Sequence, residues 1–85
     1  MVEEGILIQV GELERIGQKA TPKRTFIIDR GNEDFLAFEI WQDKAEKLPD
    51  HFEEGQTVRV SYKIGSRAWK DRWFTSATAT DISAQ

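Results

Sequence analysis

The sequence of 85 residues contains no cysteine and only one histidine. Without cysteine there can be no disulfide scaffold, no thiolate zinc site and no cysteine nucleophile, and the composition suits a reducing compartment. No apolar run approaches the ~18 residues of a membrane span. The first residues, MVEEGILIQV, are acidic where a secretory signal would be basic. We therefore expect a cytoplasmic protein without membrane contact.

The residues of common catalytic and metal sites are also scarce. His51 is the only histidine, so it cannot build a metal site with histidine partners, and the acidic residues near it lack calcium-loop spacing. The glycines lie at turns rather than in a phosphate-cradling motif, and no nucleophile is accompanied by a base. We expect no metal, no cofactor, no small-molecule substrate and no enzymatic activity.

The apolar residues are sufficient for one small core. Hydrophobic residues make up 39% of the chain, and the aromatic ones comprise three tryptophans, one tyrosine and five phenylalanines. Because chains of about 60 residues already fold alone, we expect one domain over residues 1–85, with a frayed end at about 83–85.

The net charge of −3 is unevenly distributed. Residues 15–30 and residues 59–72 each carry a net charge of +4, and the remaining residues are acidic. The total argues against a simple polycation that coats nucleic acid. Two basic segments form an ordinary mixed surface unless the fold brings them together, in which case they form an electrostatic groove.

Alternating apolar residues predict five strands, at residues 6–13, 25–30, 35–41, 57–64 and 73–82. Residues 17–22 form a loop, and residues 30–34 form a tight turn in which Gly31 and Asn32 supply positive φ angles. Residues 43–52 are the only helical candidate, and Pro49 should shorten or kink that helix. Strand parity points the following side chains inward: Leu36, Phe38, Ile40, Val58, Val60, Tyr62, Ile64 and Trp73.

The order β-β-β-α-β-β is that of an OB-fold, a five-stranded Greek-key barrel with one short helix between strands 3 and 4. Ligands of this fold usually cross strands 2 and 3, between the loop that joins strands 1 and 2 and the loop that joins strands 4 and 5. In this sequence those two loops are the basic segments. The predicted fold therefore places both of them beside one face.

That face carries aromatic residues flanked by cations, which is what single-stranded nucleic acid requires. Unpaired bases stack on rings, at about 1–3 kcal/mol each, while cations contact phosphates, and stacking tolerates any base. The candidate nucleic-acid-binding residues are Phe35, Trp41, Trp69, Phe74, Lys19, Lys23, Arg24, Arg59, Lys63, Arg67, Lys70 and Arg72.

Each aromatic candidate has a structural alternative. Trp69 could cap the open end of the barrel, Trp41 could pack on the helix, and Phe35 could pack against a second copy of the chain. Glu39 lies between Phe35 and Trp41 by parity, and its carboxylate repels phosphate unless Arg59 or Lys63 pairs with it. We therefore expect modest, salt-dependent affinity.

The stretch from Phe35 to Thr75 resembles bacterial single-stranded-DNA-binding proteins, through FEIWQDKAEKL, EEGQTVRVSYKIGSRAW and KDRWFT. It is still more similar to short bacterial OB-fold proteins without an assigned function, whose S-R-x-x-x-x-R-W-[YF]-T signature begins here at Ser66. The resemblance implies base stacking at Phe35, Trp41 and Trp69. The sequence differs from the DNA-binding family in three ways: it ends without a disordered linker and acidic tip, its hairpin between strands 4 and 5 is shorter, and Glu39 replaces an apolar residue.

Two functions remain open. The first is a non-enzymatic module that binds single-stranded nucleic acid, with DNA favoured and little sequence preference. The alternative is a protein-interaction module, such as a homodimer formed by pairing an exposed edge at Gly5 to Val10, without nucleic-acid binding.

Overall fold

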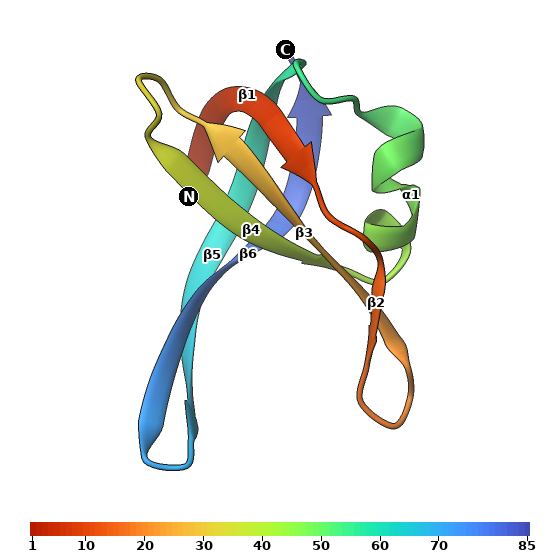
Figure 1. The fold of residues 1–85 in the computed structure, drawn as a ribbon, viewed down its shortest axis with the longest axis vertical. Coiled ribbons are helices and arrows are strands. Elements are labelled where there is room, and N and C mark those ends of the chain that lie inside the picture. Colours follow the sequence, from red (N-terminus) through yellow and green to blue (C-terminus); the bar gives the residue numbers. More distant parts are fainter.

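A computed structural model describes residues 1–85 as a six-stranded sheet closed into a barrel, with one helix (Figure 1). The elements are β1 (Val2–Val10), β2 (Glu14–Ile16), β3 (Thr21–Asp29), β4 (Phe35–Trp41), α1 (Asp43–His51), β5 (Thr57–Trp69) and β6 (Arg72–Ala84). The OB-fold is confirmed. Beyond the five predicted strands, the structure adds β2, a short strand that pairs with the start of β3. The helix α1 is neither long nor apolar enough to cross a bilayer.

Strand β1 closes the barrel because it pairs with two neighbours. Its first half pairs with β5, and its second half, from Ile6 to Val10, pairs with β3. Leu7 also exchanges backbone hydrogen bonds with Gly55 and Gln56. The expected exposed edge at Gly5 to Val10 is therefore wrong. Gly5 is required at the crossing, since a Cβ there would lie 2.5 Å from the Asp29 carbonyl oxygen.

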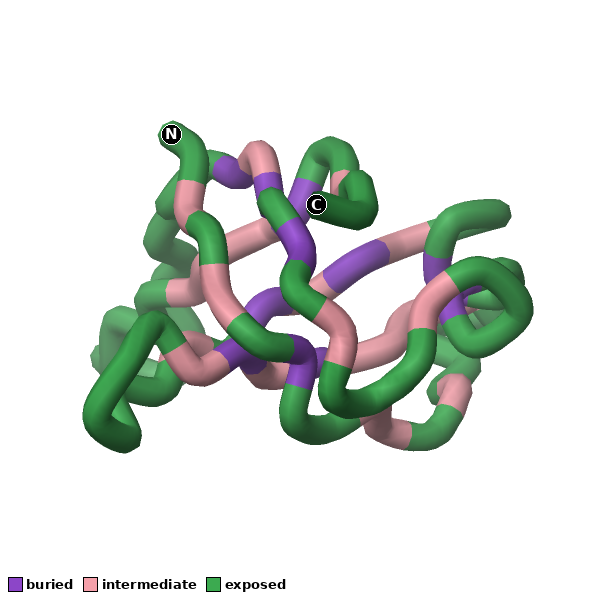
Figure 2. Tube along the Cα trace, turned by 90° about the horizontal axis from the view of Figure 1, so that it is seen from above, coloured by how far each residue is buried: buried purple, intermediate pink, exposed green.

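The core lies inside the barrel and includes residues of α1. Figure 2 shows the buried stretches in purple along the chain. Of the predicted inward residues of β4 and the first half of β5, Phe38, Ile40, Val58, Val60 and Tyr62 are buried, and Leu36 is half-buried against the core. The helix adds Ala45 and Leu48 to this core. Alternation in β4 and β5 therefore identified which face of each strand packs against the other.

Two inward predictions are wrong, at Ile64 and Trp73. Their side chains are 54% and 74% exposed. Both have the expected parity, since Ile64 lies opposite Ala77 and Trp73 lies opposite Ala68 on the same side of the β5–β6 ladder as Tyr62 and Ala79. The ladder extends beyond the barrel as a two-stranded hairpin, however, so nothing covers this side of it near its tip (Figure 1).

The turn between β3 and β4 has the predicted chemistry. Gly31 and Asn32 have positive φ angles of 124° and 54°, and Glu33 also has a positive φ. Arg30 donates to Asp34 at 2.9 Å across the turn. This hydrogen bond raises the pKa of the Arg30 guanidinium above its ordinary value.

Candidate nucleic-acid interface

Two hairpins extend from the same end of the barrel (Figure 1). One consists of β2 and the start of β3, joined by a turn at residues 17–20, and the other is the outer part of β5 and β6, which turns at Lys70 and Asp71. These hairpins contain most of the two basic segments of the sequence. The fold therefore brings the two segments to opposite sides of one opening.

A groove of about 530 Å³ lies between the hairpins, and we call it the aromatic groove. Its walls come from both hairpins and from the end of β4. The residues that line it are Ile16, Lys23, Glu39, Trp41, Arg67, Trp69, Phe74, Thr75 and Ser76.

The three rings of the groove come from three strands. Trp41 ends β4, Trp69 ends β5, and Phe74 lies on β6 directly opposite Arg67. Trp69 and Phe74 are at least half exposed, while Trp41 is half-buried. Two exposed rings on the β5–β6 hairpin and a half-buried ring at the end of β4 offer flat apolar surfaces on which planar groups can stack.

Two lysines lie over these rings. The Nζ atom of Lys70 is 4.5 Å from the centre of the Trp69 ring, and that of Lys23 is 5.7 Å from the Trp41 ring. Lys23 also lies 3.9 Å from the Glu39 carboxylate. The cation that pairs with Glu39 is therefore Lys23 of β3, and neither Arg59 nor Lys63 as the sequence suggested.

A second hollow of about 410 Å³ adjoins the groove along the outer face of β4. Both hollows are lined by Glu39, Thr75 and Ser76. The second one is also lined by Ala37, two residues from Phe35, which is exposed but lines neither hollow. The two hollows thus form a continuous path along this face.

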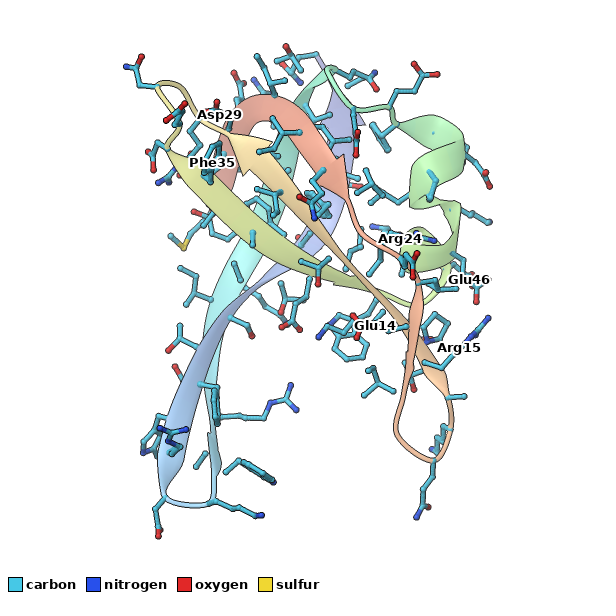
Figure 3. All side chains as sticks on the ribbon, in the orientation of Figure 1. Glu14, Arg15, Arg24, Asp29, Phe35 and Glu46 are labelled. Atoms are coloured by element: carbon cyan, nitrogen blue, oxygen red, sulfur yellow. The ribbon has the colours of Figure 1, made fainter.

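Phe35 itself does not lie between the hairpins. It pairs with Asp29 at the opposite end of β4 from Trp41, where Figure 3 shows both side chains. A ligand that contacts Phe35 and Trp69 together must therefore follow the whole length of β4.

Two candidate arginines already have partners within the protein. Arg24 donates from Nε to the Ala45 carbonyl at 2.6 Å and from Nη1 to the Gly11 carbonyl at 2.8 Å, beside α1 (Figure 3). Arg59 donates from Nε to Glu4 at 2.9 Å. Neither lines the aromatic groove.

The other three cationic candidates are exposed and form no ion pair: Lys19, Lys63 and Arg72. Lys19 lies in the turn at residues 17–20, and Arg72 lies opposite Trp69 near the tip of the longer hairpin. Lys63 lies opposite Thr78, where the hairpin leaves the barrel.

Sequence reasoning missed several residues of the path. Ile16 lines the groove from β2, a strand that was not predicted, and Ile64 lines the second hollow although its alternation suggested a core position. No local signal identifies Thr75 and Ser76 as lining residues. The longer reach of β5 and β6 beyond the barrel brings them there.

Solved structures share this fold at low sequence identity. The second single-stranded DNA-binding protein (SSBb) of Mycobacterium smegmatis is 16% identical, with a TM-score of 0.72 over 100% of this chain and 84% of that one. The SSB domain of a Synechococcus protein is 14% identical, with a TM-score of 0.76 over 96% and 90%. The N-terminal domain of PriB from Thermoanaerobacter tencongensis, described as dimeric, is 19% identical, with a TM-score of 0.64 over 100% and 93%.

These likenesses confirm, at the level of the fold, the resemblance to single-stranded-DNA-binding proteins. No curated protein matches the chain significantly. A family model described as Domain of unknown function (DUF3127) matches residues 3–83, and the chain therefore belongs to that family.

Proposed function

We propose that this protein is a non-enzymatic module that binds single-stranded nucleic acid, with DNA favoured, in the aromatic groove. The observation that supports this most directly is that three rings and the cations Lys23, Arg67 and Lys70 border one open groove. Bases would stack on Trp41, Trp69 and Phe74, and phosphates would contact the cations. The strand would continue along β4 toward Phe35.

Stacking would displace the lysines that cover the rings. In the free protein Lys70 lies on Trp69 and Lys23 lies near Trp41. When a base takes the face of the Trp69 ring, the Lys70 ammonium becomes free to contact the adjacent phosphate, whereas Lys23 stays beside the Glu39 carboxylate, within reach of the bound strand. Since part of the cation–π energy, about 0.5–1 kcal/mol at exposed sites, is lost in this exchange, we expect modest affinity.

Tryptophan substitutions test the proposal. Trp41→Ala and Trp69→Ala should each weaken binding of a mixed pyrimidine oligonucleotide by about 1–3 kcal/mol, because each removes one stacking surface. Trp73→Ala is the matched control, since Trp73 is exposed on the same hairpin but does not line the groove. Binding is measured by anisotropy of a labelled oligonucleotide at low salt.

Absence of binding by the unaltered protein at tens of micromolar would overturn the proposal. Equal losses in all three variants would also contradict it, because they would mean that the groove is no more important than any exposed tryptophan.

A self-association module is the second candidate, supported by an apolar outer surface away from the groove. Val2, Ile6 and Phe35 are exposed, and Ile6 and Phe35 both neighbour Asp29 on the outer face of β1, β3 and β4. Light scattering would give the mass in solution. A dimer that Phe35→Ala converts to a monomer would favour this candidate, and a dimer that survives it would leave β4 free for a ligand.

A further inference from the structure

Glu39 occupies the middle of the path that we propose for nucleic acid. It lines both the aromatic groove and the second hollow, and no other acidic residue lines either of them. A carboxylate repels phosphates, so this position is unfavourable for a surface that contacts only the sugar–phosphate backbone. A base edge is different, because it presents hydrogen-bond donors.

The oxygens of Glu39 have free acceptor capacity. The side chain is 23% exposed, and Lys23 at 3.9 Å is its only ionic partner. No side chain or backbone group donates a hydrogen bond to it. A half-buried carboxylate gains most from a ligand that supplies donors, because charge-assisted hydrogen bonds are the strong ones.

The four bases differ in what they offer a carboxylate. Guanine presents two adjacent donors, N1–H and the 2-amino group, which match the two oxygens. Cytosine and adenine present one amino group beside a ring acceptor. Thymine presents only N3–H, between two carbonyl groups that repel the carboxylate. Unpaired bases expose these groups on their Watson–Crick edge, and proteins contact that edge while the ring stacks on a side chain.

We propose that Glu39 reads the Watson–Crick edge of a base in the groove and makes the site prefer guanine over thymine. The Lys23 ammonium beside the carboxylate is a donor for the O6 carbonyl of the same edge. The pair thus offers one donor and two acceptors to a guanine that stacks near Trp41. This inference rests on the proposed function and adds a base preference to it.

The test compares guanine with hypoxanthine, which lacks only the 2-amino group and keeps the purine ring. Oligomers of about 12 nucleotides, within the reach of one OB-fold, alternate thymine with either base, in lithium buffer to prevent quadruplexes. The unaltered protein should bind the guanine oligomer about three- to tenfold more tightly, as expected for the net contribution of one hydrogen bond. Binding is measured by anisotropy.

Glu39→Gln should remove that ratio, because an amide offers only one acceptor oxygen, and it should tighten binding of oligothymidine. Glu46→Gln is the matched control. It also removes one negative charge from a paired glutamate, but Glu46 lies on α1 and does not line the groove. It should change all affinities together and leave the ratio intact.

Equal binding of both oligomers by the unaltered protein would overturn the inference and leave the proposed function standing. A ratio that persists in Glu39→Gln would also overturn it, since another group would then read the base. If the protein binds none of the oligomers, the proposed function fails and the inference fails with it. If Glu39→Gln does not fold, equal binding of both oligomers by the unaltered protein still overturns the inference.

Discussion

Arg24 shows how a basic residue in a candidate binding segment can serve the fold instead. Pro49 lies inside α1 and has no backbone N–H, so the carbonyl of Ala45, four residues earlier, lacks its helical donor. Arg24 Nε donates to that carbonyl at 2.6 Å. The side chain therefore satisfies a backbone group that Pro49 leaves unpaired, and it joins β3 to the helix.

We predict that Arg24→Ala lowers the free energy of unfolding by about 1.5–3 kcal/mol, the range for hydrogen bonds to charged groups. In a Pro49→Ala background the loss should be smaller, because residue 49 then donates to Ala45 itself. Urea denaturation of the two single variants and the double variant measures this coupling.

Arg15→Ala is the control for Arg24→Ala, because Arg15 is an exposed arginine that pairs with Glu46 on the same helix at 3.4 Å. Its effect should stay within about 0.5 kcal/mol. If Arg24→Ala lowers the free energy of unfolding equally with and without Pro49→Ala, the contact to the Ala45 carbonyl is not what stabilises the helix.

At the scale of elements, the alternation of apolar residues predicted which segments form strands. It was less successful at predicting which residues of those strands are buried. In β4, Phe38 and Ile40 are buried as expected because the barrel and α1 cover their face. In β5 and β6 the same pattern continues at Ile64 and Trp73, where neither side of the hairpin is covered. Alternation identifies a face, but the residues that cover it come from elsewhere in the chain.

The hairpin of β5 and β6 ends in an unfavourable turn. Lys70 and Asp71 have φ angles of 49° and 62°, in the left-handed region where a side chain costs about 1–2 kcal/mol. Two-residue hairpin turns of this kind favour glycine at the second position. The sequence therefore does not optimise the stability of this hairpin.

We predict that Asp71→Gly slows hydrogen exchange of the backbone amides between Ser66 and Thr75 by about two- to fivefold, equivalent to ~0.5–1 kcal/mol of hairpin stability. Asp71→Ala is the control, because it removes the same charge but keeps the Cβ atom. Slower exchange in both variants would assign the effect to charge instead of backbone conformation.

At the scale of the whole molecule, the net charge of −3 is the sum of basic and acidic residues that lie in different parts of the structure. The two hairpins extend from one end of the barrel, while the acidic residues of α1 lie beside it (Figure 1). The order of the strands was sufficient to predict that the two basic segments flank one face. It could not predict which cations remain free, because the partners of Arg24 and Arg59 come from α1 and β1.

The same limit applies to Glu39. Its parity on β4 was predictable, but its pairing with Lys23 depends on the register in which Lys23 lies opposite Trp41 and Thr25 lies opposite Glu39. Register is set by the whole sheet and by the turn at residues 30–34. The sequence therefore predicted that Glu39 and Lys23 belong to the candidate site, but not the contact between them.

The number of cations at or beside the groove determines how binding should respond to salt. Three cations at the groove and the neighbouring Arg72 can contact phosphates: Lys23, Arg67, Lys70 and Arg72. For single strands, log K falls with log salt at about 0.7 per contact. We predict a slope of about −2 to −3 for the unaltered protein, measured by anisotropy over a range of salt concentrations.

Arg67→Ala should reduce this slope by about 0.7, because it removes one phosphate contact. Arg59→Ala should leave the slope unchanged, since Arg59 pairs with Glu4 and does not line the groove. A slope that falls equally in both variants would mean that the strand contacts the whole basic surface. The comparison thus decides whether the two basic segments act together at the groove or only through their total charge.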